Sequence, residues 1–73
     1  MVTLGENIRN IRVRTGMSQK EAASLLNVSS SAYSRYEHDE AQIPTDVIIG
    51  MTEIYNVDFN RLYYRVEKQR MRS

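Results

Sequence analysis

Residues 27–37 read NVSSSAYSRYE and combine hydroxyl groups with a guanidinium group, side chains suited to hydrogen bonding with a polar or anionic partner. Wound as an α-helix at about 100° per residue, the stretch separates into two faces. One face holds small polar side chains and a single long cation: Ser30, Ser31, Ser34 and Arg35. The opposite face is apolar enough to bury and holds Ala32, Tyr33 and Tyr36. A solvated helix face is usually rich in Glu and Lys, so the absence of both from the polar face favours a binding role.

The charge distribution indicates which part of the chain would meet an anionic partner. The net charge of the 73 residues is only +1. Residues 1–36 carry five cations against two anions, residues 37–64 carry one cation against six anions, and residues 65–73 carry four cations against one anion. The basic surface therefore belongs to the two ends of the chain, and we expect the first half, helped by the tail, to face the anionic partner.

Length and composition predict a single soluble domain. A chain of 73 residues buries only about 60% of the surface that its unfolded form exposes, so its stability should be modest. It contains no cysteine, which excludes disulfides and thiolate metal sites and fits a reducing cytoplasm. No apolar run approaches the roughly 18 residues of a membrane span, and the first ten residues lack a signal-peptide core. We therefore expect a cytoplasmic protein that does not contact a membrane.

A capping signature predicts the first helix. Thr3 and Glu6 have the spacing of a capping box, and apolar residues follow at helical intervals until Gly16 provides a stop. The pattern predicts a helix over residues 4–14.

A second signature, Ser18 with Glu21, predicts a short helix over residues 19–26. Asn27 follows, a residue that tolerates the left-handed conformation of a helix stop, and Ser29 can cap the next helix. Two short helices joined by a three-residue turn define a helix-turn-helix. The serine run of the opening stretch is thus explained in part, because small first-turn side chains let the free N–H groups of a helix approach an anionic surface.

The second half of the chain predicts two more helices and no strands, so the expected fold is all-α with five helices. Thr45 is the expected cap of a helix that reaches Tyr55, and Gly50 inside it suggests close packing or simple tolerance. Asp58 is the expected cap of the last helix. One stripe of that helix is apolar and holds Phe59, Leu62, Tyr63 and Val66.

With these elements placed, the order MSQKEAASLLNVSSSAYSRYE followed by IPTDVIIGMTEIYNV resembles the DNA-binding domain of Cro and phage repressors, the xenobiotic-response-element (XRE) family of small bacterial and phage regulators. The resemblance covers residues 4 to about 64. It implies a compact repressor-like helix-turn-helix domain over residues 1–64. Residues 65–73 would then form a basic C-terminal extension of the last helix or a frayed tail.

The resemblance also implies roles for particular residues. The positions that match DNA-contacting residues of the family are Gln19, Ser29, Ser30, Ser31, Ser34 and Arg35. Among them, Gln19 would contact a phosphate and brace the recognition helix, and Arg35 would offer two parallel donors to a guanine. Arg12 and Glu37 match an ion pair that ties the first helix to the end of the recognition helix.

Two departures from the family pattern carry expectations of their own. Tyr33 replaces a smaller residue at a buried position, so its hydroxyl must reach a partner or the surface. Asp39 and Glu40 follow the recognition helix where relatives often have residues that grip phosphate, so nonspecific affinity for DNA should be weak.

Simpler interpretations stay open for each feature. The serine run can be a cap followed by a tolerated surface, and Arg35 can be a solvated cation whose ion pairs contribute less than about 1 kcal/mol. A single histidine, His38, beside two carboxylates is more often a polar loop than a metal site, so we expect no metal and no cofactor. The chain has no glycine-rich phosphate loop and is too short to enclose a substrate, so we do not expect an enzyme.

These observations predict sequence-specific binding of double-stranded DNA by a small transcriptional regulator, a repressor that acts as a homodimer on a two-fold operator. The apolar stripe of the last helix is the expected dimer interface. Two alternatives remain: a protein-interaction module that uses the same stripe with weak DNA binding, and an antitoxin that combines both activities.

Overall fold

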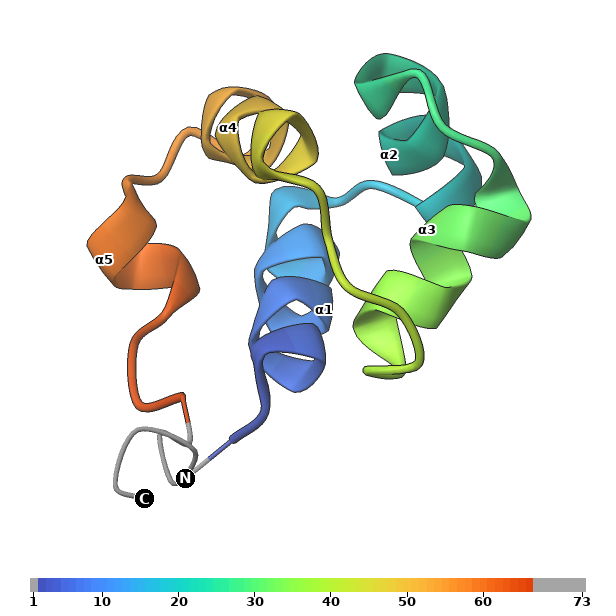
Figure 1. Cartoon of the computed structure of the whole chain (residues 1–73). Helices are drawn as coiled ribbons and strands as arrows, with labels where there is room; N and C mark the ends of the chain where they lie inside the picture. Colours follow the sequence, from blue (N-terminus) through green and yellow to red (C-terminus); the bar gives the residue numbers. More distant parts are fainter. Residues whose placement is uncertain (1, 67–73) are drawn as a thin grey trace.

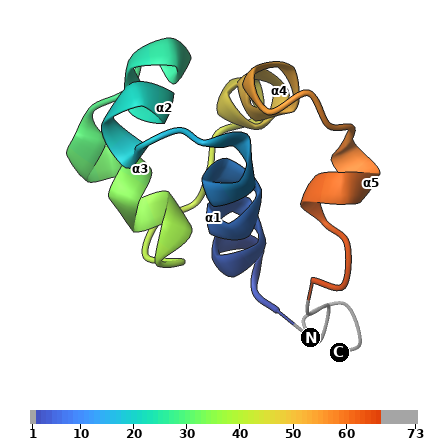
Figure 2. The same ribbon diagram turned by 180° about the vertical axis from the view of Figure 1, so that it is seen from behind.

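The computed structural model describes residues 2–66, and this part of the chain contains five helices and no strand longer than an isolated bridge. The helices are α1 (Leu4–Thr15), α2 (Gln19–Leu26), α3 (Ser30–Glu37), α4 (Thr45–Ile54) and α5 (Phe59–Leu62). Figure 1 shows α1 at the centre, with α2 and α3 on one side and α5 on the other. The view from behind in Figure 2 gives the same order, and α1 contacts both α3 and α5. The all-α prediction is confirmed.

Side-chain caps begin four of the five helices, at the residues that the sequence predicted. The side chains of Thr3, Ser18, Ser29 and Asp58 each accept a hydrogen bond from the backbone N–H three residues further on. The first two helices also have the reciprocal bond from a glutamate to the cap backbone, which completes a capping box. Gly16 and Asn27 end α1 and α2 with positive φ angles of 88° and 60°. The turn that joins α2 to α3 therefore follows from local chemistry.

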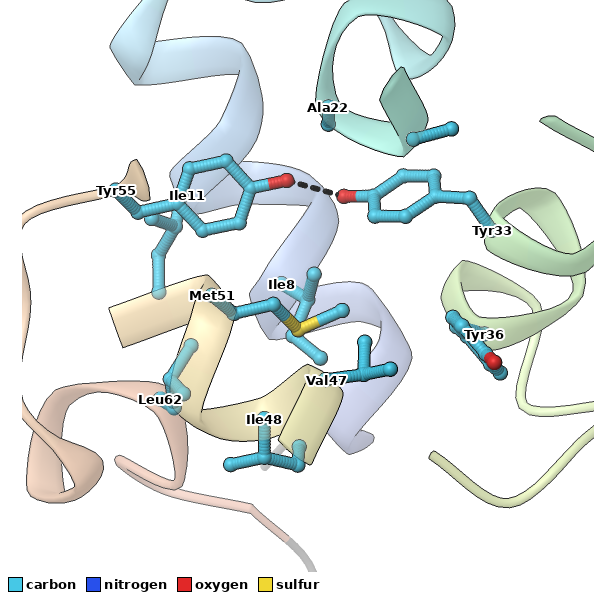
Figure 3. Packing of buried hydrophobic residues seen from close by; sticks show 11 residues of the cluster. Ile8, Ile11, Ala22, Tyr33, Tyr36, Val47, Ile48, Met51, Tyr55 and Leu62 are labelled. Carbon is cyan, nitrogen blue, oxygen red and sulfur yellow. Dashed lines mark hydrogen bonds between the residues drawn. The ribbon is translucent and has the colours of Figure 1, made fainter. Parts of the chain in front are cut away.

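The hydrophobic core lies between α1, α2, α3 and α4, and α5 closes it at one end. Its largest fully buried side chains are Tyr33, Ile8, Met51 and Leu62. Figure 3 shows the Tyr33 and Tyr55 hydroxyls pointing toward each other within this core, where they share a hydrogen bond. The expectation that the Tyr33 hydroxyl finds a partner is met inside the protein, so a polar tip is buried without being left unpaired.

Two glycines mark places where helices approach closely. A Cβ atom on Gly5 would lie 2.5 Å from the carbonyl oxygen of Glu37 and 2.7 Å from that of Tyr36, so α1 packs directly on the backbone at the end of α3. A Cβ atom on Gly50 would lie 2.8 Å from Cδ2 of Leu26, which belongs to a flexible side chain. Gly50 thus fits close packing between α4 and α2, whereas the contact at Gly5 is with rigid backbone.

The start of α4 differs slightly from the prediction. Thr45 is the first residue of the helix and does not cap it; Pro44 occupies the cap position and forms no side-chain hydrogen bond. Proline has no side-chain acceptor, so it cannot cap the helix through its side chain; the Pro44 carbonyl instead accepts hydrogen bonds from the Val47 and Ile48 N–H groups, both at 3.0 Å. The helix ends at Ile54, with Tyr55 at its C-cap.

The last helix is much shorter than predicted, and this changes the interpretation of its apolar stripe. After Leu62 the chain turns, Arg65 adopts a φ of 61°, and the Val2 N–H donates to the Arg65 carbonyl over 3.1 Å. Leu62 is 0% exposed and Val66 is 5% exposed, so both are buried by the chain itself. The prediction that these two residues form a dimer interface is therefore wrong, while Phe59 and Tyr63 remain exposed. The division of the chain near residue 64 stays a prediction, because residues 67–73 lie outside the described part.

None of the helices described between residues 2 and 66 is long and apolar enough to cross a membrane.

Candidate nucleic-acid interface

The outer face of α3 carries the predicted polar side chains at the surface. Ser30, Ser31 and Arg35 are exposed, as is the cap residue Ser29, and Ser34 is half-buried. Arg35 forms no ion pair with any described residue, and its side chain makes one hydrogen bond to them, a long one of 3.4 Å from Nη2 to the carbonyl of Glu40. This face is therefore free to meet a partner.

The inner end of α3 is held by an ion pair with α1. Arg12 Nε donates to Glu37 Oε2 at 2.7 Å, and Arg12 Nη2 donates to Glu37 Oε1 at 3.2 Å. A third donor of the guanidinium, Nη1, bonds the carbonyl of Met17 at 2.8 Å. The pair is buried, with the two side chains 11% and 0% exposed. Arg12 thus fixes the end of α3 and the turn after α1 relative to each other.

Gln19, at the start of α2, completes this arrangement. Its Nε2 donates to Glu37 Oε1 at 2.8 Å, so α1, α2 and α3 meet at one carboxylate. The bracing role implied by the family resemblance is visible in this bond. An amide nitrogen carries two hydrogens, so the second can still reach a phosphate, and that contact stays a prediction.

The network keeps Glu37 ionised. Burial by itself would raise the pKa of Glu37, but the hydrogen bonds from Arg12 and Gln19 outweigh it and hold that pKa below its ordinary value. The hydrogen bond to Glu37 raises the pKa of Arg12, against the opposing effect of burial. Burial also raises the pKa of Tyr55 to about 12, so this hydroxyl stays protonated at neutral pH.

The segment after α3 contains a residue whose role the sequence did not reveal. Asp39 has a φ of 59° and its carboxylate reaches back to the start of α1. It accepts a hydrogen bond from Thr3 Oγ1 at 2.5 Å and another from the Gly5 N–H at 2.9 Å. Aspartate is favourable near a helix N-terminus, but these partners lie more than 30 positions away in the sequence, and no local pattern indicates them. Asp39 is therefore a structural anion as well as part of the acidic loop.

The turn and the two helices around it match a known family. A family model described as Helix-turn-helix matches residues 8–62. The chain belongs to the helix-turn-helix family. Within this helix-turn-helix domain, α2 and α3 are the two helices of the motif, and the resemblance to XRE-type regulators is confirmed at the level of the family.

Curated relatives of this helix-turn-helix domain include named regulators. The chain is 34% identical over 61 residues to the HTH-type transcriptional regulator ImmR of Bacillus subtilis, covering 84% of this chain and 48% of ImmR. It is 33% identical over 55 residues to the HTH-type transcriptional regulator RamB of Mycobacterium tuberculosis, covering 75% of this chain and 12% of RamB. It is 29% identical over 56 residues to the antitoxin PezA of Streptococcus pneumoniae, covering 77% of this chain and 35% of PezA.

The chain thus spans about half the length of ImmR and a smaller part of the other two relatives. No solved structure matches the chain at a significant level. The comparisons therefore concern the helix-turn-helix domain alone.

Proposed function

We propose that this helix-turn-helix domain binds double-stranded DNA in a sequence-specific manner and acts as a small transcriptional regulator, a repressor. The observation that carries the proposal is the contrast between the two faces of α3. Its inner end is locked by Arg12 and Gln19, whereas its outer face presents exposed hydroxyls and a guanidinium that pairs with no described carboxylate. A rigid helix with a polar outer face is what the major groove admits.

Arg35 is the residue that would read sequence. It is the only side chain on the outer face that is long enough to cross into the groove and offer two parallel donors, which match O6 and N7 of guanine. Ser30 and Ser31, in the first turn, would make adaptable hydrogen bonds to base edges or phosphate. Their small size lets the N-terminus of α3, with its free N–H groups, approach the DNA.

Backbone contacts would come from the start of α2. Gln19 retains one amide hydrogen for a phosphate, and Lys20 is exposed beside it. Few other cations flank α3, and the loop after it keeps the charges of Asp39 and Glu40. We therefore expect nonspecific DNA binding to be weak, with a dissociation constant of roughly 10⁻⁴ M at physiological salt. This dissociation constant should depend only weakly on salt concentration.

A homodimer would let two copies read a two-fold operator, with recognition helices about 34 Å apart. Support comes from aromatic side chains at and just after α5: Phe59 is 50% exposed and Tyr63 is 37% exposed. Sedimentation at tens of micromolar checks this proposal. Tyr63→Asp should shift a wild-type dimer to monomer without loss of helicity, and a monomeric wild type would refute it.

The similarity to PezA supports antitoxin activity as a second candidate. A candidate of that kind would bind DNA as well as a protein partner. Co-purification of the chain with the protein encoded by a neighbouring gene would distinguish an antitoxin from a regulator that only binds DNA. A stable stoichiometric complex is expected only for an antitoxin.

The decisive experiment selects bound duplexes from a random pool and then compares two variants. Arg35→Ala should cost about 1–3 kcal/mol on the selected operator and relax the preference at one base pair in each half-site. Lys20→Ala should weaken all sequences alike if Lys20 contacts phosphate. If Arg35→Ala loses the same affinity for every DNA sequence, Arg35 contacts the DNA backbone and does not read bases. If no sequence is enriched from the random pool, specific DNA binding is refuted.

A further inference from the structure

A groove of about 380 Å³ lies between α1 and the segment around α5. It is lined by Asn7, Asn10, Arg14, Arg61 and Tyr64. The three residues from α1 are spaced at three and four positions, so they form one stripe along the side of the helix that faces α5. All five side chains are polar or aromatic, and none is acidic.

The two arginines that line this groove have no carboxylate partner among the described residues, in contrast to Arg12 of α1. Arg12 is paired with Glu37, whereas neither Arg14 nor Arg61 lies within 4.0 Å of a carboxylate among residues 2–66. A third cation is close by, because the guanidinium of Arg65 lies 5.9 Å from the centre of the Tyr64 ring. Asp58, the acidic residue nearest to Arg61 in the sequence, instead caps α5 by accepting from the Arg61 N–H at 2.9 Å. The positive charge of the groove is therefore not neutralised by the described residues.

Asn7 gives the groove a fixed floor. This side chain is only 7% exposed, and its Nδ2 donates to the carbonyls of Arg61 at 3.0 Å and Leu62 at 2.5 Å. These bonds satisfy two carbonyls at the end of α5, which would otherwise repel an anion. They also fix α5 against α1 and so hold Arg14 and Arg61 on facing walls.

We propose that this groove binds a small organic phosphate. Guanidinium groups match the oxygens of phosphate in a fork of parallel hydrogen bonds, and two of them on facing walls can hold one such group between them. The volume is in the range of pockets for small ligands, and the Tyr64 ring and the Asn10 amide can contact the organic part. A nucleotide combines these features: a phosphate, a planar ring and polar edges.

The groove is separate from the proposed DNA interface. Figures 1 and 2 both place α5 on the side of α1 opposite to α3, so a duplex bound along α3 does not meet the groove. The inference therefore does not rest on the proposed function, and it can hold whether or not α3 reads DNA.

The test uses the ¹⁵N-labelled full chain and two probes, inorganic pyrophosphate and AMP, added at constant ionic strength. We expect saturable shifts of the side-chain signals of Asn7, Asn10, Arg14 and Arg61. Arg14→Gln and Arg61→Gln should each weaken binding of the probe by roughly tenfold, since each removes a charge-assisted hydrogen bond. Arg9→Gln removes the same charge from an exposed position of α1 outside the groove and should leave the affinity unchanged.

Three results would overturn the proposal. The first is the absence of saturable binding of either probe. The second is an equal loss of affinity for Arg9→Gln and the two groove variants, which would indicate only general attraction to a basic surface. The third comes from a parallel titration with a short DNA duplex: if the duplex but neither small probe shifts the groove signals, the groove holds phosphates of the DNA backbone. Preserved spectral dispersion of each variant shows that it is folded.

Discussion

The two faces of α3 are built in opposite ways, although both belong to one helix of eight residues. On the inner face Tyr33 and Glu37 are buried, and they form hydrogen bonds with side chains from the C-cap of α4, from α1 and from α2. On the outer face Ser30, Ser31 and Arg35 are exposed, and among residues 2–66 the only side-chain hydrogen bond of these three is the long one from Arg35 to the Glu40 carbonyl. If α3 reads DNA as proposed, stability and recognition depend on different sides of one helix. Substitutions on the inner face should change the free energy of unfolding, and those on the outer face should change binding.

The largest effect is expected for Glu37→Ala. The substitution leaves the guanidinium of Arg12 largely buried without its carboxylate, which should lower the free energy of unfolding by about 3 kcal/mol. Urea denaturation followed by circular dichroism measures the change. Replacing both Arg12 and Glu37 by apolar residues should recover much of the loss. Glu40→Ala, which removes an exposed carboxylate three positions away, is the matched control and should change stability little.

A melting temperature of Glu37→Ala equal to that of the wild type would show that the pair is solvated in solution. The inner face would then not differ from the outer one in the way described.

The next largest effect is expected for Gly5→Ala. The new methyl group would meet the backbone carbonyls of Tyr36 and Glu37 at 2.7 Å and 2.5 Å, and backbone cannot move aside, so we expect a loss of about 2 kcal/mol. Gly50→Ala is the matched control. Its methyl group meets only the end of the Leu26 side chain, and alanine favours a helix by about 1 kcal/mol over glycine, so its unfolding free energy should stay near that of the wild type. Equal effects of the two substitutions would contradict the close packing of α1 on α3.

A pH titration sharpens the comparison at Glu37. Since the pKa of Glu37 is lowered on folding, its contribution to stability is complete above the ordinary pKa of 4.5 and is lost as the pH falls through the lower folded value. Glu37→Gln lacks this titrating group. We therefore expect the stability advantage of the wild type over Glu37→Gln to be constant near neutral pH and to shrink below pH 4.5. This stability advantage could instead stay constant down to about pH 3, which is near the acid end of ordinary carboxyl pKa values. That result would show that the network does not lower the pKa of Glu37.

The comparison also shows which features of the molecule can be predicted from sequence. Caps and stops are local, so Thr3, Ser18, Ser29 and Asp58 indicated where helices begin, and Asn27 indicated the turn. The two faces of α3 follow from helical periodicity alone. The Arg12 to Glu37 pair spans 25 positions, and it was expected only because the chain resembles a family that has it.

Contacts between distant segments were missed where no periodicity indicates them. Asp39 at the start of α1, Asn7 at the end of α5 and the close approach at Gly5 depend on how the helices are placed in space. The end of α5 was predicted too late for a related reason. An apolar stripe at helical spacing looks the same whether it continues as a helix or turns back, as here, so that Val66 pairs with Val2.

The smallest effect on stability, and the sharpest separation of the two faces, is expected for Ser34→Ala. Alanine has the higher helix propensity, so removing this hydroxyl from the middle of α3 should raise the free energy of unfolding by up to about 0.5 kcal/mol. If the outer face binds DNA, the same substitution should weaken the operator complex, because a hydrogen bond near the DNA backbone is lost. Ser24→Ala, at an exposed position in the middle of α2, should give the same gain in stability with no change in affinity. Thermal melts and operator titrations of the two variants side by side measure both quantities. If Ser34→Ala behaves like Ser24→Ala in both, Ser34 contributes nothing to recognition, and the binding surface is confined to Arg35 and the first turn of the helix.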